Sequence, residues 1–315
     1  MNLDKKGFLS YLLLPISVAF YFLSNARRYL YQIGFFRSYN FKAPVIVVGN
    51  ITVGGSGKTP IVIALVEHLK RQGKKVGVVS RGYGGKRSNK TLYVNQDTNV
   101  LQSGDEPLMI ATQTKVPVAV NIDRSKAVKD LIESYEVEIV ISDDGLQHYS
   151  MSRDVEIAVI DGKRRFGNGF FLPSGPLREP LSRLNSVDFV VNNGALHPGE
   201  IFSNLVPKMY INLSTLESKP IDFFKNITCH AVAGIGHPQR FFDTLTDLNV
   251  DILPHSFTDH HYYSEDDLLF TTNHPIIMTS KDCVKCRSFA TDQMWYLLLE
   301  SDLSEDFLTK LTDKL

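Results

Sequence analysis

Short apolar runs alternate with helical periodicities through most of this chain. Between the runs, apolar residues recur every three or four positions, as in the segment 60–71 before Gly73. Short continuous apolar runs are typical of strands buried on both faces, with helices covering the sheet. The first two-thirds of the chain therefore predict an α/β fold with a parallel sheet. The predicted strands lie at 45–48, 75–80, 116–120, 137–141, 155–160 and 187–191.

A second series of strands and helices begins near residue 207. A short strand is expected at 208–213, joining the two halves, and further strands are expected at 229–234, 250–255, 274–280 and 293–300. Alternation of helix and strand again indicates a parallel sheet. We therefore predict three parts: an amino-terminal helix in residues 1–36, an α/β domain in 37–206, and a second, smaller α/β domain in 207–315.

The amino-terminal segment is hydrophobic and flanked by cations. Residues 8–23 are apolar except for two serines and Pro15, with two lysines at 5–6 and two arginines at 27–28. A helix of this length spans about 24 Å, which is short of the ~20 residues that normally cross a bilayer. No cleavage site of a signal peptide follows. We interpret the segment as a helix in the membrane interface, its cations meeting anionic headgroups. The alternative is a helix packed against the protein's own core.

Bulk composition narrows the function classes. The 315 residues carry a formal net charge of +0, so no basic field indicates binding of nucleic acid. The three cysteines, Cys229, Cys283 and Cys286, are too few for a disulfide framework and indicate a reducing compartment. Cys283 and Cys286 have metal-ligand spacing, but no second pair of ligands accompanies them, which favours a structural role.

A glycine-rich turn follows the first strand and is typical of a phosphate-binding loop. Backbone N–H groups of such a loop converge on phosphate oxygens, its lysine contacts the β- and γ-phosphates, and its hydroxyl binds Mg²⁺. Thr52 stands where the usual pattern has its first glycine, but Lys58 and Thr59 stand where the mechanism needs them. The alternative is a glycine-rich turn with a surface lysine. The predicted ATP-binding residues are Thr52, Val53, Gly54, Gly55, Ser56, Gly57, Lys58 and Thr59.

Polar segments follow the later strands. Asp143 and Asp144 come directly after an apolar run, where a carboxylate downstream of a phosphate loop is expected to organise Mg²⁺; the alternative is a helix cap. Asp105 and Glu106 precede a helix, either as catalytic carboxylates or as complements of its dipole. The cation-rich loop 81–87 either contacts phosphate or a nucleobase or is only solvated.

Taken together and in order, seven motifs resemble the tetraacyldisaccharide 4′-kinase family. The resemblance runs from the hydrophobic amino terminus to about Arg287, which is nearly the whole chain. It is specific, because several motifs of this length occur in the right order. The motifs are Gly54–Pro60, Ser80–Gly84, Gly104–Pro107, Asp143–His148, Arg165–Gly169, Leu172–Glu179 and Ala233–Pro238.

The resemblance implies an ATP- and Mg²⁺-dependent kinase of lipid A biosynthesis. Such enzymes transfer the γ-phosphate of ATP to the 4′-hydroxyl of a membrane-embedded tetraacylated glucosamine disaccharide 1-phosphate. It implies a P-loop NTPase-like parallel sheet for residues 37–206. It also gives the amino-terminal helix a purpose, since the lipid's acyl chains stay in the bilayer while its sugar must reach the phosphate loop. The implied location is the cytoplasmic face of the inner membrane.

The family's catalytic groups fall on particular residues here. Its loop lysine matches Lys58, its Gly-Asp-Glu carboxylate matches Asp105, and its partner histidine matches His260, which is followed by a second histidine, His261. Asp105 and His260 belong to different predicted domains, so the smaller domain is expected to close over a cleft and assemble the site.

The remaining roles that the resemblance implies concern metal and substrate. Thr59 with Asp143 or Asp144 is expected to hold the metal. In the segment 278–282, Ser280 replaces the usual glutamate of the family, which leaves the role of that acid open. The residues expected at the substrate are Glu106, Gln147, His148, Arg178, Glu179, Arg81 and Tyr83.

Two other function classes fit parts of the sequence. A membrane-associated switch protein that hydrolyses ATP would also need the phosphate loop and the amino-terminal helix. Guanine specificity is not expected in this chain. The Asn-Lys-x-Asp motif that normally recognises guanine is absent, and residues Asn192–Ala195 stand in its place. A binding module without catalysis would not need the acids Asp105, Asp143 and Asp144 at loop ends.

Overall fold

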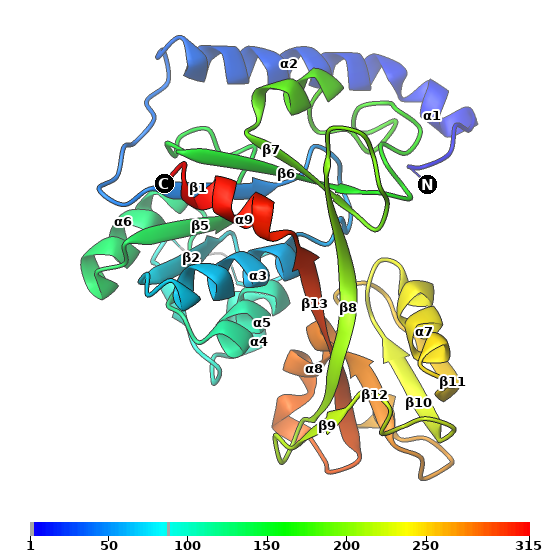
Figure 1. Ribbon diagram of the computed structural model, residues 1–315. Coiled ribbons are helices and arrows are strands. Elements are labelled where there is room, and N and C mark those ends of the chain that lie inside the picture. The colour runs from blue at the N-terminus through cyan, green and yellow to red at the C-terminus, as the bar shows by residue number, and fades with distance from the viewer. Residues whose placement is uncertain (1–2, 87–88) are drawn as a thin grey trace.

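The computed structural model describes residues 3–86 and 89–315, so Arg87 of the predicted cationic loop and the first two residues of the chain lie outside the described residues. Within that part of the chain, thirteen strands form one sheet (Figure 1). They are β1 (Val45–Gly49), β2 (Val76–Ser80), β3 (Leu92–Val94), β4 (Val118–Val120), β5 (Ile139–Asp143), β6 (Val155–Asp161), β7 (Phe189–Asn193), β8 (Ile201–Asn212), β9 (Ser218–Pro220), β10 (Thr228–Ala233), β11 (Asp251–Ser256), β12 (Ile276–Thr279) and β13 (Met294–Leu303).

Helices surround this sheet. The α-helices of the described residues are α1 (Phe8–Leu12), α2 (Leu14–Gln32), α3 (Lys58–Arg71), α4 (Val100–Ser103), α5 (Asp105–Thr114), α6 (Arg124–Tyr135), α7 (Pro238–Asp247), α8 (Ser280–Cys286) and α9 (Glu305–Thr312). Three short 3₁₀ segments add η1 (Leu181–Ser186), η2 (Asp266–Leu268) and η3 (Arg287–Phe289). The alternation of helix and strand that the sequence predicts is therefore confirmed.

The sheet is mostly parallel, and its strand order is β11-β10-β12-β13-β8-β7-β6-β1-β5-β2-β4-β3, with β9 paired to β8. β1 lies between β5 and β6 and is parallel to both. Among the longer strands, the reversal of direction occurs between β8 and β13. Figure 1 shows these two strands running from one lobe of the molecule to the other. We call β1–β7 with their helices the first lobe, and β9–β12 with α7 and α8 the second lobe.

One strand prediction was wrong in length. The sequence predicts a short strand at 208–213, whereas β8 has 12 residues and starts at Ile201. The early part of β8 has polar residues and Pro207, which cannot donate to a strand ladder and therefore hides the strand signal. The partner strand adapts with a shift in register between Leu298 and Leu299, and Leu299 pairs with Pro207.

Alternate side chains of β1 enter two different cores. Val45 and Val47 pack in a cluster with Ala127 and Val128 of α6, on one face of the sheet. Ile46 and Val48 pack on the other face in a cluster that includes α3 and α5. That second cluster continues through Val232, Met278 and Cys283 of the second lobe, so the two lobes share buried apolar contacts.

The carboxyl-terminal helix returns to the first lobe. The Phe307 ring of α9 lies 5.1 Å from the Phe189 ring of β7, and Lys314 forms an ion pair with Asp188 at 2.7 Å. In Figure 1, α9 accordingly lies beside the strands of the first lobe. The segment 207–315, predicted as one domain, therefore supplies elements to both lobes.

Helices α1 and α2 lie along the outside of the first lobe (Figure 1). They are attached by few polar contacts, such as the Ser17 hydroxyl, which donates to the Phe171 carbonyl at 2.7 Å. Many of their large apolar side chains are exposed, including Phe8, Phe22 and Leu23 at 86, 65 and 72%. Across the described residues, no helix combines the length and the apolar character that crossing a bilayer requires.

Candidate active site

The predicted phosphate-binding loop joins β1 to α3. Gly57 caps α3 with a left-handed backbone (φ 80°), and a Cβ on it would lie 2.0 Å from the Asn193 amide nitrogen. Only glycine fits both the backbone and the space. Lys58 is the first residue of the helix, so the partial positive charge of the helix N-terminus and the lysine ammonium act on the same volume.

Four hydrogen bonds hold this loop, one from Asn50 directly after β1 and three that involve other segments of the chain. The Asn50 amide donates to the Ser56 hydroxyl at 3.2 Å, and the Asn193 amide donates to the Ser56 carbonyl at 3.2 Å. The Val53 N–H donates to the Pro176 carbonyl at 2.8 Å, and the Arg164 guanidinium donates to the Val53 carbonyl at 2.6 Å. Segments from three other loops therefore hold the predicted ATP-binding residues in one conformation.

Asp143 and Asp144 follow on the neighbouring strand, because β5 pairs with β1 and Val48 is opposite Asp143. Both oxygens of the Asp143 carboxylate are buried and without a hydrogen-bond partner. Burial and the nearby Glu106 carboxylate raise the pKa of Asp143 to about 7, although Lys58 opposes this. The side chain caps no helix, and a buried carboxylate without donors is suited to a cation.

Asp144 has the opposite electrostatic environment. Its carboxylate accepts two bonds from the Arg178 guanidinium at 3.1 Å and lies 3.5 Å from the Lys58 ammonium. Burial alone would raise the pKa of Asp144, but Lys58, Arg178 and Arg124 outweigh it and hold this pKa well below the usual range. Arg124, fully buried, donates to the Asp144 carbonyl at 2.6 Å.

Gln147 and Glu179 extend this cluster. The Gln147 amide donates to the Asn50 carbonyl at 2.9 Å and to Glu179 at 2.6 Å, while its oxygen accepts from Arg178 at 3.3 Å. Glu179 also accepts from the Tyr149 hydroxyl at 2.7 Å. Four of the predicted site residues, Asp144, Gln147, Arg178 and Glu179, are thus connected to Lys58.

Asp105 lies at the start of α5 and is 4% exposed. Its carboxylate accepts from Nδ1 of His260 at 2.9 Å, across the two lobes. The second histidine, His261, instead contacts Asp267 at 3.3 Å. The structure therefore brings His260, and not His261, to Asp105. Both acids of α5 occupy its first turn, so they also complement the helix dipole.

The surroundings of the pair Asp105–His260 favour the charged form of each side chain. Burial would raise the pKa of Asp105, but the hydrogen bond from His260 and the ammonium groups of Lys281 and Lys285 hold it below its usual value. The hydrogen bond to Asp105 raises the pKa of His260. Lys281 lies 3.9 Å from Asp105 and 3.7 Å from Glu106, and these two carboxylates raise its pKa against the effect of burial.

The loop that follows β2 packs on the start of α5. Gly104 has φ 83°, and a Cβ there would lie 2.3 Å from the Tyr83 carbonyl, so this contact requires glycine. The Tyr83 ring lies 5.2 Å from the His260 ring, and Tyr262 donates to the Gly84 carbonyl at 2.6 Å. Tyr83 therefore belongs to the group around Asp105, and its own side chain is 67% exposed.

Two electrostatic links connect the Asp105 group with the phosphate loop. The Glu106 carboxylate, next to Asp105, raises the pKa of Asp143, and the Lys58 ammonium lowers it. Burial is the main cause that lowers the pKa of Arg124, and the nearby charge of Arg81 lowers it further. His148 contacts none of the residues named for this site and instead bonds to Ser150 at 3.1 Å; burial and Arg124 lower its pKa to about 4.

Sequence reasoning assigned no role to several residues that the structure places here. Lys281 and Lys285 of α8 are one helical turn apart and reach Asp105 from the second lobe. Their i, i+4 spacing was the available signal. Arg164 stands in a loop whose many glycines and arginines were visible, but only the fold shows that it reaches Val53.

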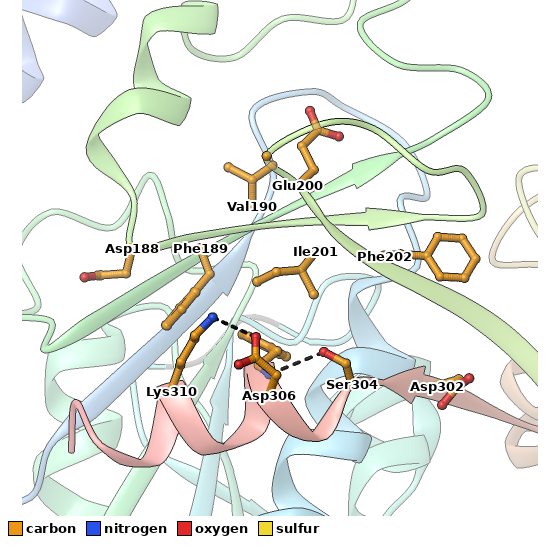
Figure 2. Close-up of a pocket in the computed structure, with 12 residues that line it drawn as sticks. Asp188, Phe189, Val190, Glu200, Ile201, Phe202, Asp302, Ser304, Asp306 and Lys310 are labelled. Atoms are coloured by element: carbon orange, nitrogen blue, oxygen red, sulfur yellow. Dashed lines mark hydrogen bonds and ion pairs between the residues drawn. The ribbon is translucent and has the colours of Figure 1, made fainter.

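A cavity of about 540 Å³ lies away from these residues, between α9 and strands β7, β8 and β13 (Figure 2). Its lining combines aromatic rings such as Phe189 and Phe307 with carboxylates such as Glu200. Glu200 is already paired with Arg165 through two bonds of 2.6 and 2.8 Å. The cavity contains none of the predicted site residues, whereas Asp105 and His260 line a narrow cleft with Gly84 and Tyr262.

Comparison with known proteins agrees with this geometry. The profile of the family Tetraacyldisaccharide-1-P 4′-kinase matches residues 9–315. A protein from Ruthia magnifica subsp. Calyptogena magnifica named tetraacyldisaccharide 4′-kinase is 60% identical over 315 residues, which is 100% of both chains. A protein of that name from Psychromonas ingrahamii is 46% identical over 308 residues, 97% of this chain and 95% of its own.

A solved structure has a similar fold. LpxK from Aquifex aeolicus in complex with ATP superposes with a TM-score of 0.83 at 31% identity, covering 98% of each chain. The resemblance predicted from the motifs is therefore confirmed, and the chain belongs to the tetraacyldisaccharide-1-P 4′-kinase family.

Proposed function

We propose that this protein is an ATP-dependent kinase of lipid A biosynthesis that phosphorylates the 4′-hydroxyl of a tetraacylated glucosamine disaccharide 1-phosphate. Family membership supports the reaction, and LpxK in complex with ATP supports the nucleotide. The observation that carries the proposal is the hydrogen bond of 2.9 Å between His260 and Asp105. This bond joins the two lobes. The next acid of α5, Glu106, raises the pKa of Asp143, and Lys58 of the phosphate loop lowers it.

The first lobe binds ATP in this proposal, in a P-loop-like loop. Backbone N–H groups of residues 52–59 surround the phosphates, and Lys58 neutralises the β- and γ-phosphates. Lys58 is available for this because its ion pair with Asp144 is 3.5 Å long and Arg178 can keep Asp144 paired.

Mg²⁺ is expected with the nucleotide. Asp143 suits the ion, because its two buried carboxylate oxygens accept no hydrogen bond. Thr59, in the first turn of α3, would supply a second ligand. Asp144 already has two cations as partners, so Asp143 is the better candidate ligand. Magnesium usually takes only one or two protein carboxylates, together with phosphate oxygens and waters. When bound, the ion neutralises charge on the transferred phosphate.

Asp105 is the general base. The 4′-hydroxyl gives its proton to the Asp105 carboxylate while the hydroxyl oxygen attacks the γ-phosphorus and ADP leaves. His260 donates from Nδ1 to Asp105 and so fixes the orientation of the carboxylate. Glu106, Tyr83 and Arg81 lie on the two segments that border Asp105 and are candidates for contact with the sugar or its phosphate. Arg178, Glu179 and Gln147 form a hydrogen-bonded group with Asp144 and are further candidates for contact with the substrate. His148, which bonds to Ser150, is the weakest of the candidates that the resemblance implies.

The amino-terminal helices place this site at the membrane in our proposal. Their exposed apolar side chains, among them Phe8 and Leu23, suit insertion into the interface of a bilayer. Arg27 of α2 donates to the Gln147 carbonyl at 3.3 Å, so the helix touches the loop that carries Asp144. Since the reaction consumes ATP, we propose the cytoplasmic face of the inner membrane as the location.

The test is transfer of labelled γ-phosphate. Purified protein is given ATP labelled at the γ-position and the disaccharide 1-phosphate in mixed micelles, and the label on the lipid is followed. We expect label on the lipid at a rate that depends on both substrates. If ATP is consumed at the same rate with and without lipid and no lipid becomes labelled, the protein is an ATP-hydrolysing switch and the proposal fails.

A further inference from the structure

Lys285 is a buried cation beside the proposed base. Its side chain is 1% exposed, and its ammonium lies 3.7 Å from the Asp105 carboxylate. It lines the same narrow cleft as Asp105 and His260. A lysine is almost never buried to this degree without partners, because desolvation of its charge is costly.

Its principal partner is Asp282, one turn earlier in α8. Asp282 is fully buried, and one of its oxygens accepts from Lys285 at 2.8 Å. The other oxygen accepts from the Gly234 N–H at 2.9 Å and from the Thr279 hydroxyl at 2.7 Å. Asp282 is thus fixed by the second lobe alone and holds Lys285 in place, as does the Tyr263 ring, 5.4 Å below the ammonium.

Lys285 therefore faces two carboxylates from different lobes. Asp282 belongs to the second lobe, and Asp105 belongs to α5 of the first lobe. The distance of 3.7 Å to Asp105 is longer than a hydrogen bond, so the contribution to Asp105 is that of a nearby charge. Because both groups are buried, solvent screens this interaction little.

The charges around Asp105 make this cation important. His260, Lys281 and Lys285 face the carboxylate from the second lobe, and Glu106 adds a second negative charge on its own helix. Lys281 also pairs with Glu106 and Asp259 and is 18% exposed. Lys285 has one other acidic partner, Asp282, and is 1% exposed. Burial raises the pKa of Asp105 and so opposes its ionisation. The fixed ammonium of Lys285 lowers this pKa and offsets part of that effect.

We propose that Lys285 is a positioning residue for phosphoryl transfer, whose buried ammonium keeps the Asp105 carboxylate ionised in a site closed to water. This inference rests on the proposed function, in which Asp105 is the base. It predicts that the second lobe contributes a charge to the base as well as a histidine. The competing explanation is that Lys285 serves only as the counter-ion of Asp282.

Three variants separate these explanations. Lys285→Met removes the charge and leaves Asp282 buried without its counter-ion, so this variant is expected to be less stable. Lys285→Met combined with Asp282→Asn removes both charges and keeps an acceptor for Gly234, so it is expected to regain most of the stability. Lys285→Arg keeps the charge. Each is compared with the wild type for its melting temperature and for kcat/KM of lipid phosphorylation from pH 5 to 9.

We expect the acidic limb of the kcat/KM profile to move to higher pH by about one unit or more in both variants that lack the cation. The KM for ATP should stay unchanged, because Lys285 contacts none of residues 52–59. Lys285→Arg should keep the wild-type limb. A double variant with regained melting temperature and a wild-type pH profile would overturn the inference, even if the wild type labels the lipid normally. Absence of labelling by the wild type would instead refute the proposed function, and the inference with it.

Discussion

Asp161, at the end of β6, accepts two bonds from the Arg240 guanidinium of α7, at 2.7 and 3.0 Å. The pair connects the two lobes, as Asp105 and His260 do. Asp161 is 4% exposed, and its carboxylate also accepts from the backbone of Lys163 and Arg164, beside the loop that holds Val53. Two ion pairs, Asp161–Arg240 and Asp105–His260, therefore stabilise the contact between the lobes.

Arg240→Gln should weaken closure more than stability. The Arg240 side chain is 45% exposed and Asp161 keeps its two backbone donors, so the free energy of unfolding should fall by only about 1 kcal/mol. A less populated closed form should lower kcat/KM for the lipid by roughly 10-fold. Small-angle scattering would show a larger radius of gyration. Arg71→Gln is the control, since the Arg71 guanidinium donates to the Glu67 carbonyl of its own helix, α3. An equal loss in both variants would argue against a role of the Arg240–Asp161 pair in closure.

Asp105→Asn should remove the proposed general base without removing ATP binding. Loss of a general base lowers turnover by roughly 10²–10⁴-fold. The KM for ATP should change little, because Asp105 contacts none of residues 52–59. The hydrogen bond to the carboxylate raises the pKa of His260, so a titration by NMR should find a lower pKa in the variant. Asp105→Ala should behave alike, and near-normal turnover in either variant would remove Asp105 from this role.

Asp143→Asn should change stability in a pH-dependent way. The pKa of Asp143 is raised to about 7 in the folded protein, mainly by burial. The neutral carboxyl therefore favours the folded state below the unfolded pKa of ~3.9, and this contribution is lost as pH rises through about 7. Asparagine has no charge to bury, so the variant should be more stable than the wild type at pH 8, by up to about 4 kcal/mol, and similar at pH 4.

Thermal melting without nucleotide measures this difference. Addition of MgATP should reverse the order at pH 8, because the wild-type carboxylate gains a cation and the variant does not. A variant that melts below the wild type at pH 8 without ligand would show that Asp143 has a partner in the folded protein.

The sequence predicted where the contiguous segments of the candidate site lie in the fold. The segments 54–60 and 143–148 are local: one strand, one turn and one helix fix the positions of Lys58 and Asp143, and both are recognisable without tertiary information. Likewise the apolar runs predicted strands on both sides of the cleft. The roles of individual side chains remain predictions. Asp144, Gln147, Arg178 and Glu179 are connected to Lys58, and His260 meets Asp105, whereas His148 joins neither group.

Apart from Asp105–His260, which the family resemblance implied, the cross-lobe contacts could not be read from the sequence. Arg240 and Lys285 lie on α7 and α8, and their partners Asp161 and Asp105 are 79 and 180 residues away in the chain. Their roles depend on how the lobes are joined, and the joining strand β8 was only partly recognised because Pro207 interrupts its pattern. Packing, rather than local propensity, decides these contacts.

Arg164→Gln should weaken ATP binding. The Arg164 guanidinium is 13% exposed, donates to the Val53 carbonyl at 2.6 Å and pairs with Asp4 at 2.6 Å. Its loss frees the loop to adopt other conformations, so we expect the KM for ATP to rise by about 10-fold, which corresponds to ~1.4 kcal/mol. The next residue is a matched control: Arg165 pairs with Glu200 instead. Arg165→Gln should lower the melting temperature and leave the KM for ATP unchanged. If the KM for ATP rises equally in both variants, Arg164 has no specific role.

Phe22→Ser combined with Leu23→Ser should weaken attachment to membranes. The two side chains are 65 and 72% exposed, and burial of such a side chain in an apolar medium contributes about 1.5–3 kcal/mol. The double variant should therefore bind vesicles of anionic phospholipid at least about 100-fold more weakly in a flotation assay. Leu269→Ser is the matched control, since Leu269 is 74% exposed but belongs to the second lobe. Turnover with a short-chain, water-soluble substrate analogue should be unaffected in both variants, because neither substitution touches Lys58 or Asp105. Equal flotation of the double variant and the wild type would mean that α2 is not the part of the protein that enters the bilayer.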